Sequence, residues 1–294
     1  MTAEWGPKRW AGRVNSILRA TLGPDRFPID VPLVAREVSR ALFPSDPVTH
    51  VIGAPLPGFE GALYPPEIGG RGWAIVYNSD ISSPGRINFT LGHELGHYFV
   101  HRKSLPEGLH CSTEKTAGWD SLEARIEREA NEFAAHLLMP LDDFRLQIAE
   151  AAKPGFAGLS LCGKRYNVSL LAAGLQWLSY TRQRALIVVS RDGYVLWSWS
   201  SESARRAGNI IRTSGNPVEI PINSLAASRK RVNSQTILSR DKVGSWFPEP
   251  VDEQVIYSDN YDFVISLLTL EEVFVHLDEE QEIDLFDHFT DRVV

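Results

Sequence analysis

The stretch His93-Glu94-Leu95-Gly96-His97 is the part of the sequence that decides the fold and the class of site. If this stretch is helical, His93 and His97 lie one turn apart on the same face and can direct their imidazole nitrogens at one ion. Neutral imidazole is a good ligand for zinc, which accepts tetrahedral coordination. The spacing therefore predicts a metal site on a helix, and we expect the bound ion to be Zn2+.

Glu94, directly after the first histidine, supplies the second part of the pattern. Its carboxylate can reach a metal-bound water without becoming a ligand, as a general base should. Zinc lowers the pKa of such a water towards neutrality, and Glu94 would take its proton while the water attacks a carbonyl. We therefore predict hydrolysis with Glu94 as the catalytic residue. The alternative interpretation is two surface histidines on a helix beside an unrelated carboxylate.

A third ligand is needed, and its position tests the prediction. His101 continues the four-residue spacing, but eight residues of helix rise about 12 Å, so His93 and His101 cannot both contact one ion. The longer HExxHxxGxxH pattern also fails, because Val100 and Lys103 occupy its last two defining positions. The third ligand must therefore come from another segment.

A second predicted helix, at about residues 122–139, offers that ligand. One row on this helix, at spacings of three and four residues, consists of Glu127, Ala130, Asn131 and Ala134. The small residues of the row permit another helix to come close. We predict Glu127 as the third metal ligand, with Asn131 as a hydrogen-bond partner that orients the site. Glu129 is the alternative ligand, and both glutamates could instead be solvated helix charges.

The segments before the motif indicate how the cleft is built. The metal helix is expected to follow a cap at Thr90 and to run from Leu91 to His101. Residues 73–77 form a short apolar run with strand character. We expect this strand to be the floor or the edge of the cleft, where an extended substrate could pair with it.

Two blocks of the sequence resemble the ImmA/IrrE family of zinc metallopeptidases. The first block is Arg86-Ile-Asn-Phe-Thr-Leu-Gly-His-Glu-Leu-Gly-His-Tyr-Phe-Val-His101, and the second is Glu127-Arg-Glu-Ala-Asn-Glu-Phe-Ala-Ala-His-Leu-Leu-Met-Pro140. Both blocks are long, and they follow one another in the order and separation of that family. The resemblance covers about residues 25–145.

The resemblance implies a zincin-like fold of the α+β class, with zinc as the cofactor. Matched by position, His93, His97 and Glu127 would bind the metal, and Glu94 would be catalytic. The family's activity implies a site-specific zinc metalloendopeptidase whose protein substrate is a helix-turn-helix transcriptional repressor. Cleavage of the repressor would act in a stress response or a mobile-element response.

The chain has 294 residues, which is enough for more than one domain. We expect a zincin-like metallopeptidase domain at 1–150, a helix-turn-helix-like helical segment at 151–182 and an α+β C-terminal domain at 183–294. Longer members of the family carry a GAF-like domain there, so the resemblance implies a GAF-like sensor. Strand-like runs on both sides of Asp192-Gly193 also predict a hairpin at the start of this domain.

The helical segment at 158–180 allows two interpretations. In one, Lys164, Arg165 and the second helix contact DNA. In the other, which we favour, the two helices bridge two domains, because residues 170–178 are mostly apolar. The net charge of −7 also disfavours a protein whose main task is to bind nucleic acid.

The composition is that of an ordinary globular protein, with 43% hydrophobic and 23% charged residues. Two cysteines, Cys111 and Cys162, are too few for a secreted disulfide framework. No apolar run has the length of a signal peptide core or a membrane span. We therefore expect a cytoplasmic protein that has no membrane partner.

A different class of function is the main alternative. The protein would then be a non-enzymatic, zinc-containing regulator or sensor that acts through its C-terminal domain or through DNA contact. The intact Glu94 argues against this alternative, because a structural zinc site has no need of a general base.

Overall fold

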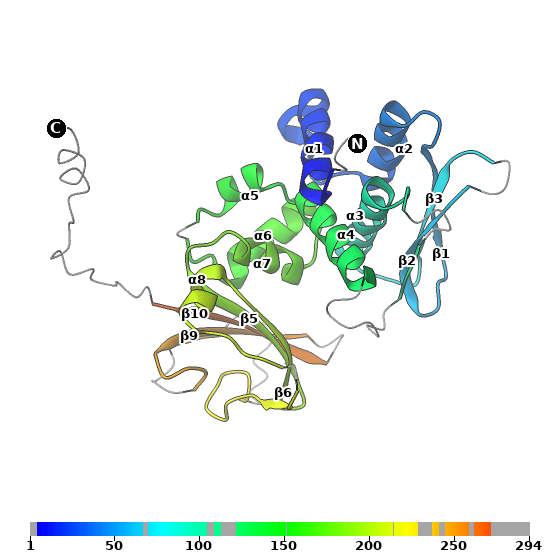
Figure 1. Cartoon of the computed structure of the whole chain (residues 1–294). Coiled ribbons are helices and arrows are strands. Elements are labelled where there is room, and N and C mark those ends of the chain that lie inside the picture. Colours follow the sequence, from blue (N-terminus) through cyan, green and yellow to red (C-terminus); the bar gives the residue numbers. More distant parts are fainter. Residues whose placement is uncertain are drawn as a thin grey trace, which may run out of the picture.

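The computed structural model describes residues 5–66, 70–104, 109–112, 122–150, 152–213, 215–228, 237–240, 245–258 and 262–271. Two sheets and two groups of helices make up this part of the chain, in agreement with the α+β class (Figure 1). Of the predicted C-terminal domain, residues 272–294 lie outside the described residues.

The first sheet has four strands in the order β1-β3-β2-β4. They are β1 (Val48–Ala54), β2 (Phe59–Tyr64), β3 (Trp73–Asn78) and β4 (Leu109–Ser112). β3 runs parallel to β1 and antiparallel to β2, and β2 also pairs antiparallel with β4. The run at 73–77 is therefore an inner strand and not an edge, because it has a hydrogen-bonded neighbour on both sides. Among the described strands, β4 is the outermost on the β2 side.

The helices of the first half pack on this sheet and on one another. They are α1 (Pro7–Leu22), the 3-10 helix η1 (Gly23–Arg26), α2 (Val31–Leu42), α3 (Pro84–Val100), α4 (Leu122–Leu138) and α5 (Leu141–Gln147). α3 contacts both the sheet and α4, so it lies at the centre of this half (Figure 1). Leu95 and Tyr98 of α3 are fully buried, as are Ile75 of β3 and Phe133 of α4.

α3 begins earlier than predicted. Its first residue is Pro84, and the Ser83 hydroxyl accepts a hydrogen bond from the Arg86 amide at 3.4 Å. Proline suits a first helical turn, because its fixed φ is helical and an N–H there would have no helical partner. The predicted cap at Thr90 is therefore wrong. Thr90 is a buried residue inside the helix, and His101 directly follows the last helical residue.

Small residues allow α3 and α4 to approach closely. A Cβ added at Gly96 would lie 3.0 Å from the carbonyl oxygen of Ala130, and one added at Gly92 would lie 3.4 Å from the Ala134 Cβ. The row of small residues on α4 therefore faces two glycines four residues apart on α3. This contact fixes the separation of the two helices that carry the candidate ligands.

The segment predicted to be helix-turn-helix-like forms two short helices. They are α6 (Gly155–Tyr166) and α7 (Leu170–Leu178). The Ser169 hydroxyl caps α7 by accepting a backbone amide hydrogen bond at 3.1 Å. A Cβ at Gly174 would lie 2.4 Å from Ile187 Cδ1 of the second sheet. Every residue of α7 is buried or half-buried. The helix therefore fills the space between the two halves and offers no exposed side chain to a DNA groove (Figure 1).

The second sheet has the order β7-β6-β5-β10-β9-β8, and each pair of neighbours is antiparallel. Its elements are β5 (Arg184–Arg191), β6 (Tyr194–Ser200), α8 (Glu202–Arg206), β7 (Val218–Glu219), β8 (Ile237–Arg240), β9 (Val251–Ser258) and β10 (Phe263–Leu270). The predicted hairpin joins β5 to β6. Asp192 and Gly193 have φ values of 51° and 84°, and positive φ at both central residues is typical of a type I′ turn.

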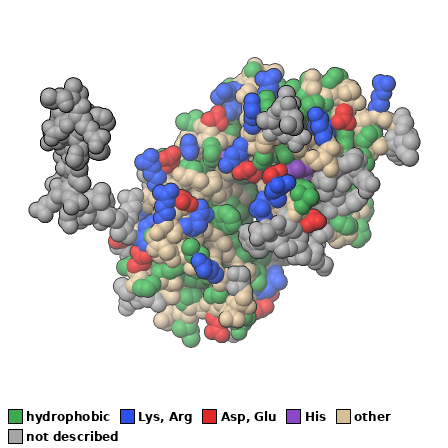
Figure 2. Space-filling view, in the orientation of Figure 1, with side chains coloured by type: hydrophobic (Ala, Val, Ile, Leu, Met, Phe, Trp, Pro, Cys, Tyr) green, Lys and Arg blue, Asp and Glu red, His purple; other side chains and the backbone are tan. Residues whose placement is uncertain are grey.

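Surface properties of the described residues bear on two further expectations. None of their helices has the length and hydrophobicity that crossing a bilayer requires. On the face shown in Figure 2, acidic side chains lie among the basic ones. A nucleic-acid backbone would therefore meet both signs of charge on that face.

Gly96→Ala is expected to destabilise the protein, because the added methyl group would press on the Ala130 backbone and on Phe133. Overpacking costs about 1–3 kcal/mol, while alanine in place of glycine in a helix contributes about 1 kcal/mol. Gly12→Ala on α1 is the matched control, since a Cβ there has no atom within 4 Å. Urea unfolding should show a lowered midpoint for Gly96→Ala only. Equal midpoints for the two variants would contradict the tight helix contact.

Candidate metal centre

Three donor atoms from α3 and α4 converge at the position predicted for the metal. His93 Nε2 and His97 Nε2 are 2.9 Å apart. Glu127 places one carboxylate oxygen 3.3 Å from His93 Nε2 and the other 3.4 Å from His97 Nε2. The His93 and His97 side chains are 10% and 0% exposed, whereas that of Glu127 is 41% exposed. The group is therefore enclosed on the histidine side and open to solvent on the glutamate side.

These separations fit a zinc ion. Ligands about 2.0–2.1 Å from a tetrahedral zinc lie about 3.3 Å from one another, and the three observed separations are 2.9, 3.3 and 3.4 Å. Two imidazole nitrogens and one carboxylate are a donor set that zinc accepts, with a fourth position left for water or substrate. The three side chains can therefore hold a metal ion of this type.

Asn131 determines which nitrogen of His93 faces the site. Its side-chain oxygen lies 3.0 Å from His93 Nδ1, and an amide oxygen only accepts hydrogen bonds. His93 Nδ1 therefore carries the proton and donates it, which leaves the lone pair of Nε2 directed at the metal position. The structure thus places Asn131 against a candidate ligand, as the spacing on α4 predicts.

A chain of hydrogen bonds orients His97 in the same way. A Glu129 carboxylate oxygen lies 2.9 Å from His101 Nε2, and His101 Nδ1 lies 3.1 Å from His97 Nδ1. Because a carboxylate only accepts, a neutral His101 carries its proton on Nε2 and accepts at Nδ1 from His97. The Nε2 lone pair of His97 then faces the metal position. Glu129, the alternative ligand, therefore supports a ligand through His101 and is not among the three converging donors.

The pKa values of His97 and Glu127 agree with a cation site. Burial lowers the pKa of His97 to about 4, so its imidazole is neutral near pH 7. Burial would also lower the pKa of His93, but the Glu127 hydrogen bond and the charge of Glu94 outweigh burial and raise that pKa. Burial would raise the pKa of Glu127, but its hydrogen bonds with the two histidines outweigh burial and hold that pKa well below its ordinary value. Glu127 is therefore an anion at neutral pH.

Glu94 is fully buried between α3 and the sheet. β2 passes so close that a Cβ on Gly61 would lie 2.7 Å from Glu94 Oε1 and 2.7 Å from Thr90 Cγ2. Glycine is the residue that leaves room for the carboxylate at this close approach. The strand therefore shields from bulk water a carboxylate that belongs to the residue next to His93.

A second contact fastens β2 to α3 beside Glu94. Arg86 donates from Nε to Glu60 Oε2 at 3.1 Å and from Nη2 to the other Glu60 oxygen. Thr90 Oγ1 also donates to Glu60 Oε2, at 3.4 Å. The Arg86 hydrogen bonds lower the pKa of Glu60 in spite of its partial burial. The charged pair therefore holds the strand and the helix together about two turns before Glu94.

Some features of the site were not predicted from the sequence. They are the chain of hydrogen bonds from Glu129 through His101 to His97, the close approach at Gly61 and the pair of Glu60 with Arg86. His101 carried a signal, because its four-residue spacing from His97 places it on the same helix face. The sequence held no such signal for Gly61 or Glu60. Their roles at the site depend on β2 lying against a helix about 30 residues further along the chain.

A match to a known protein family confirms the resemblance. Residues 49–177 match the Peptidase_M78 family, described as the IrrE N-terminal-like domain. This segment is therefore similar to the IrrE N-terminal-like domain of a peptidase family, and it contains all the residues of the metal centre. The match begins in β1 and ends in α7, so it also includes α6. No curated protein matched the chain.

Glu127→Ala is expected to remove bound zinc, because two histidines alone are an incomplete ligand set. Glu129→Gln should keep the metal but weaken its affinity about 10- to 100-fold, the usual effect of losing a partner that orients a ligand. Glu123→Gln is the control, since Glu123 is an exposed residue at the start of the same helix. Metal analysis and competition with a zinc chelator measure these effects. Unchanged zinc content in Glu127→Ala would place the third ligand elsewhere.

Proposed function

We propose that this chain is a zinc metalloendopeptidase, with His93, His97 and Glu127 as metal ligands and Glu94 as the general base. The observation that carries the proposal is the convergence of two imidazole lone pairs and a carboxylate next to the fully buried Glu94. A structural zinc site has four protein ligands, whereas three donors leave one position open. The match of this domain to a peptidase family agrees with hydrolysis.

The metal ligands and Glu94 have separate chemical roles in the proposed reaction. A bound zinc ion supplies Lewis acidity, which makes water acidic enough to be a nucleophile near neutral pH. Glu94, shielded by β2, accepts the proton of the nucleophile and can return it to the leaving amine. His93 and His97 are held in place through Asn131 and His101, so that the reacting groups keep their alignment.

An extended segment of a protein substrate suits the neighbouring edge of the sheet. β4 pairs with β2 on one side, and no other described strand pairs with its opposite side. A substrate strand could extend the sheet through backbone hydrogen bonds to β4. Gly61, which lies against Glu94, is in register with Cys111 of β4, so such a strand would lie two strand spacings, about 10 Å, from Gly61.

The family resemblance supports a helix-turn-helix transcriptional repressor as the substrate, cleaved in a stress or mobile-element response in the cytoplasm. It also supports a GAF-like sensor role for the second sheet. α7 would connect such a sensor to the peptidase half. Gln176 of α7 donates to the Met139 carbonyl at 2.7 Å, at the end of the helix that carries Glu127, and Gly174 packs on Ile187 of β5.

Glu94→Gln should keep zinc and lose proteolysis, because a glutamine side chain cannot accept the proton. We expect the cleavage rate to fall about 100-fold or more. The experiment incubates the zinc-loaded protein with helix-turn-helix regulators encoded beside its gene and identifies the products by mass spectrometry. Cleavage by Glu94→Gln at the wild-type rate would disprove the general-base role. A wild-type protein that holds zinc and cuts none of these regulators would favour the non-enzymatic alternative.

Gly61→Ala tests the contact between β2 and the general base. The added Cβ must displace the Glu94 carboxylate or Thr90, and a small misplacement of a reacting group costs about 10- to 100-fold in rate. We therefore expect slower cleavage at unchanged zinc content. Gly12→Ala, which adds the same methyl group in open space on α1, should cleave at the wild-type rate. Full activity of Gly61→Ala would show that Glu94 does not act from its position against β2.

A further inference from the structure

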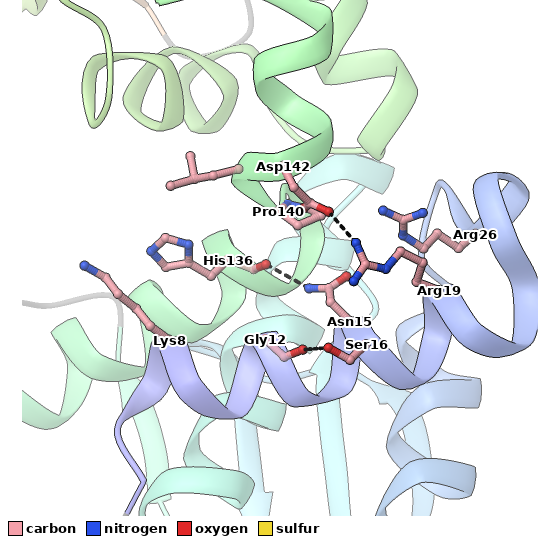
Figure 3. Close-up of a pocket in the computed structure, with 10 residues that line it drawn as sticks. Lys8, Gly12, Asn15, Ser16, Arg19, Arg26, His136, Pro140 and Asp142 are labelled. Carbon is pink, nitrogen blue, oxygen red and sulfur yellow. Dashed lines mark hydrogen bonds and ion pairs between the residues drawn. The ribbon is translucent and has the colours of Figure 1, made fainter.

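A pocket of about 360 Å³ lies between α1, η1 and the junction of α4 with α5. Its charged and polar lining includes Lys8, Asn15, Arg19, Arg26, His136 and Asp142, and none of the three candidate metal ligands. Figure 3 shows Lys8 and His136 towards one end, with Arg19 and Arg26 towards the other. Arginine and lysine contribute three cationic groups to this lining. Lys8 pairs with Glu132 at 3.1 Å and Arg19 with Asp142 at 3.3 Å, so Arg26 is the one of the three that forms no ion pair among the described residues. The pocket is therefore suited to an anion.

One face of α1 forms a wall of the pocket. Lys8, Gly12, Ser16 and Arg19 recur at spacings of three and four residues and all line it. From Lys8 to Arg19 this face extends about 16 Å along the helix axis. In the middle, a Cβ at Gly12 would have no atom within 4 Å. The wall is therefore open there, with space between the two cationic ends.

Arg26 is a buried residue of the pocket whose hydrogen bonding is incomplete. It is only 8% exposed, and its Nη1 donates to the Gly23 carbonyl at 3.0 Å. Its Nε has no hydrogen-bond partner in the part of the chain that the structure describes. A buried charge ordinarily has a counter-charge and a full set of hydrogen bonds. Asp143 lies close enough to act as a counter-charge for Arg26, but the hydrogen bonding of the Arg26 guanidinium is incomplete among the described residues.

The carboxylates nearest to this end of the pocket are engaged with other groups. Asp142 accepts from Arg19 at 3.3 Å. Asp143, on the next residue, accepts two hydrogen bonds from Arg165, both at 2.9 Å. Neither carboxylate forms an ion pair with Arg26 among the described residues. A bound anion would therefore offer Arg26 an acceptor that does not already serve another arginine.

We propose that this pocket binds a small phosphate-bearing molecule. Guanidinium groups offer paired N–H donors that match phosphate oxygens, and Arg19 and Arg26 bring two guanidinium groups to one pocket. A phosphate dianion would place negative charge beside the buried guanidinium of Arg26, which forms no ion pair among the described residues. The pocket extends from the two arginines along α1 towards Lys8, and this part of the pocket leaves room for a substituent on the phosphate. The volume also lies within the range of small-molecule sites, about 300–1,000 Å³.

A ligand in this pocket would link α1 to the helix that carries Glu127. Asn15 already makes such a link, because it donates to the carbonyl oxygens of His136 at 3.0 Å and Leu137 at 3.1 Å. His136 lies nine residues beyond Glu127, about 13 Å along the helix. Binding should therefore stabilise the fold without any contact with the metal centre.

The experiment measures binding of inorganic phosphate and of AMP to the full-length, zinc-loaded protein by calorimetry and thermal unfolding. Chloride keeps the ionic strength constant. Gly12→Glu places a carboxylate in the open part of the pocket, and Gly12→Ala is its matched control. Wild type and Gly12→Ala should bind the probe and melt at a higher temperature as its concentration rises. Gly12→Glu and Arg26→Gln should bind at least about tenfold more weakly, a loss of about 1.4 kcal/mol.

The outcomes separate this pocket from other phosphate sites. Tighter binding of AMP than of phosphate, lost in Gly12→Glu, would support a phosphate ester, and equal binding of both would support free phosphate. A probe that stabilises no more than chloride, or that binds Gly12→Glu as well as wild type, would overturn the proposal. Binding lost in Glu127→Ala but kept in Gly12→Glu would assign phosphate to the metal centre and also overturn it. If Arg26→Gln does not fold, Gly12→Glu still decides, because position 12 is exposed and free of packing contacts.

Discussion

The contact of two glycines on α3 with two alanines on α4 sets the distance between the candidate ligands. Two histidines come from one helix and the glutamate from the other, so a wider separation would move the carboxylate away from the imidazoles. Gly96 lies between His93 and His97 in the sequence but faces Ala130, because neighbouring residues of a helix point in different directions. One stretch of helix therefore supplies both the ligands and the packing surface that places the third ligand.

The same helix geometry explains the position of His101. A rise of two turns keeps it from sharing an ion with His93, yet a single turn separates it from His97 and allows the 3.1 Å hydrogen bond between their Nδ1 atoms. Each candidate imidazole ligand thus has its own partner, Asn131 from α4 or His101 directly after α3. The ring orientations are fixed by hydrogen bonds within the protein, so a metal ion would meet a prepared set of lone pairs.

Features that depend on nearby residues were predictable from the sequence, and features that depend on strand pairing were not. The motif spacing, the small row on α4 and the Asp192-Gly193 turn are local patterns with a direct physical meaning. The predicted start of α3 is too late, because proline and glycine are unfavourable in a helix interior but proline is favoured in a first turn. β4 and the contact of Gly61 with Glu94 could not be foreseen, because they arise only when distant segments of the sheet come together.

The position of α7 has a consequence for how the whole chain unfolds. Ala173 and Trp177 are fully buried and belong to one continuous hydrophobic core with Leu137 of α4 and Ile187 of β5. Removing the second sheet would leave part of that core in water, and each large apolar side chain so exposed costs about 1.5–3 kcal/mol. The two halves should therefore melt in a single cooperative transition. Any stress that loosens one half would then be transmitted to the other as a loss of shared stability.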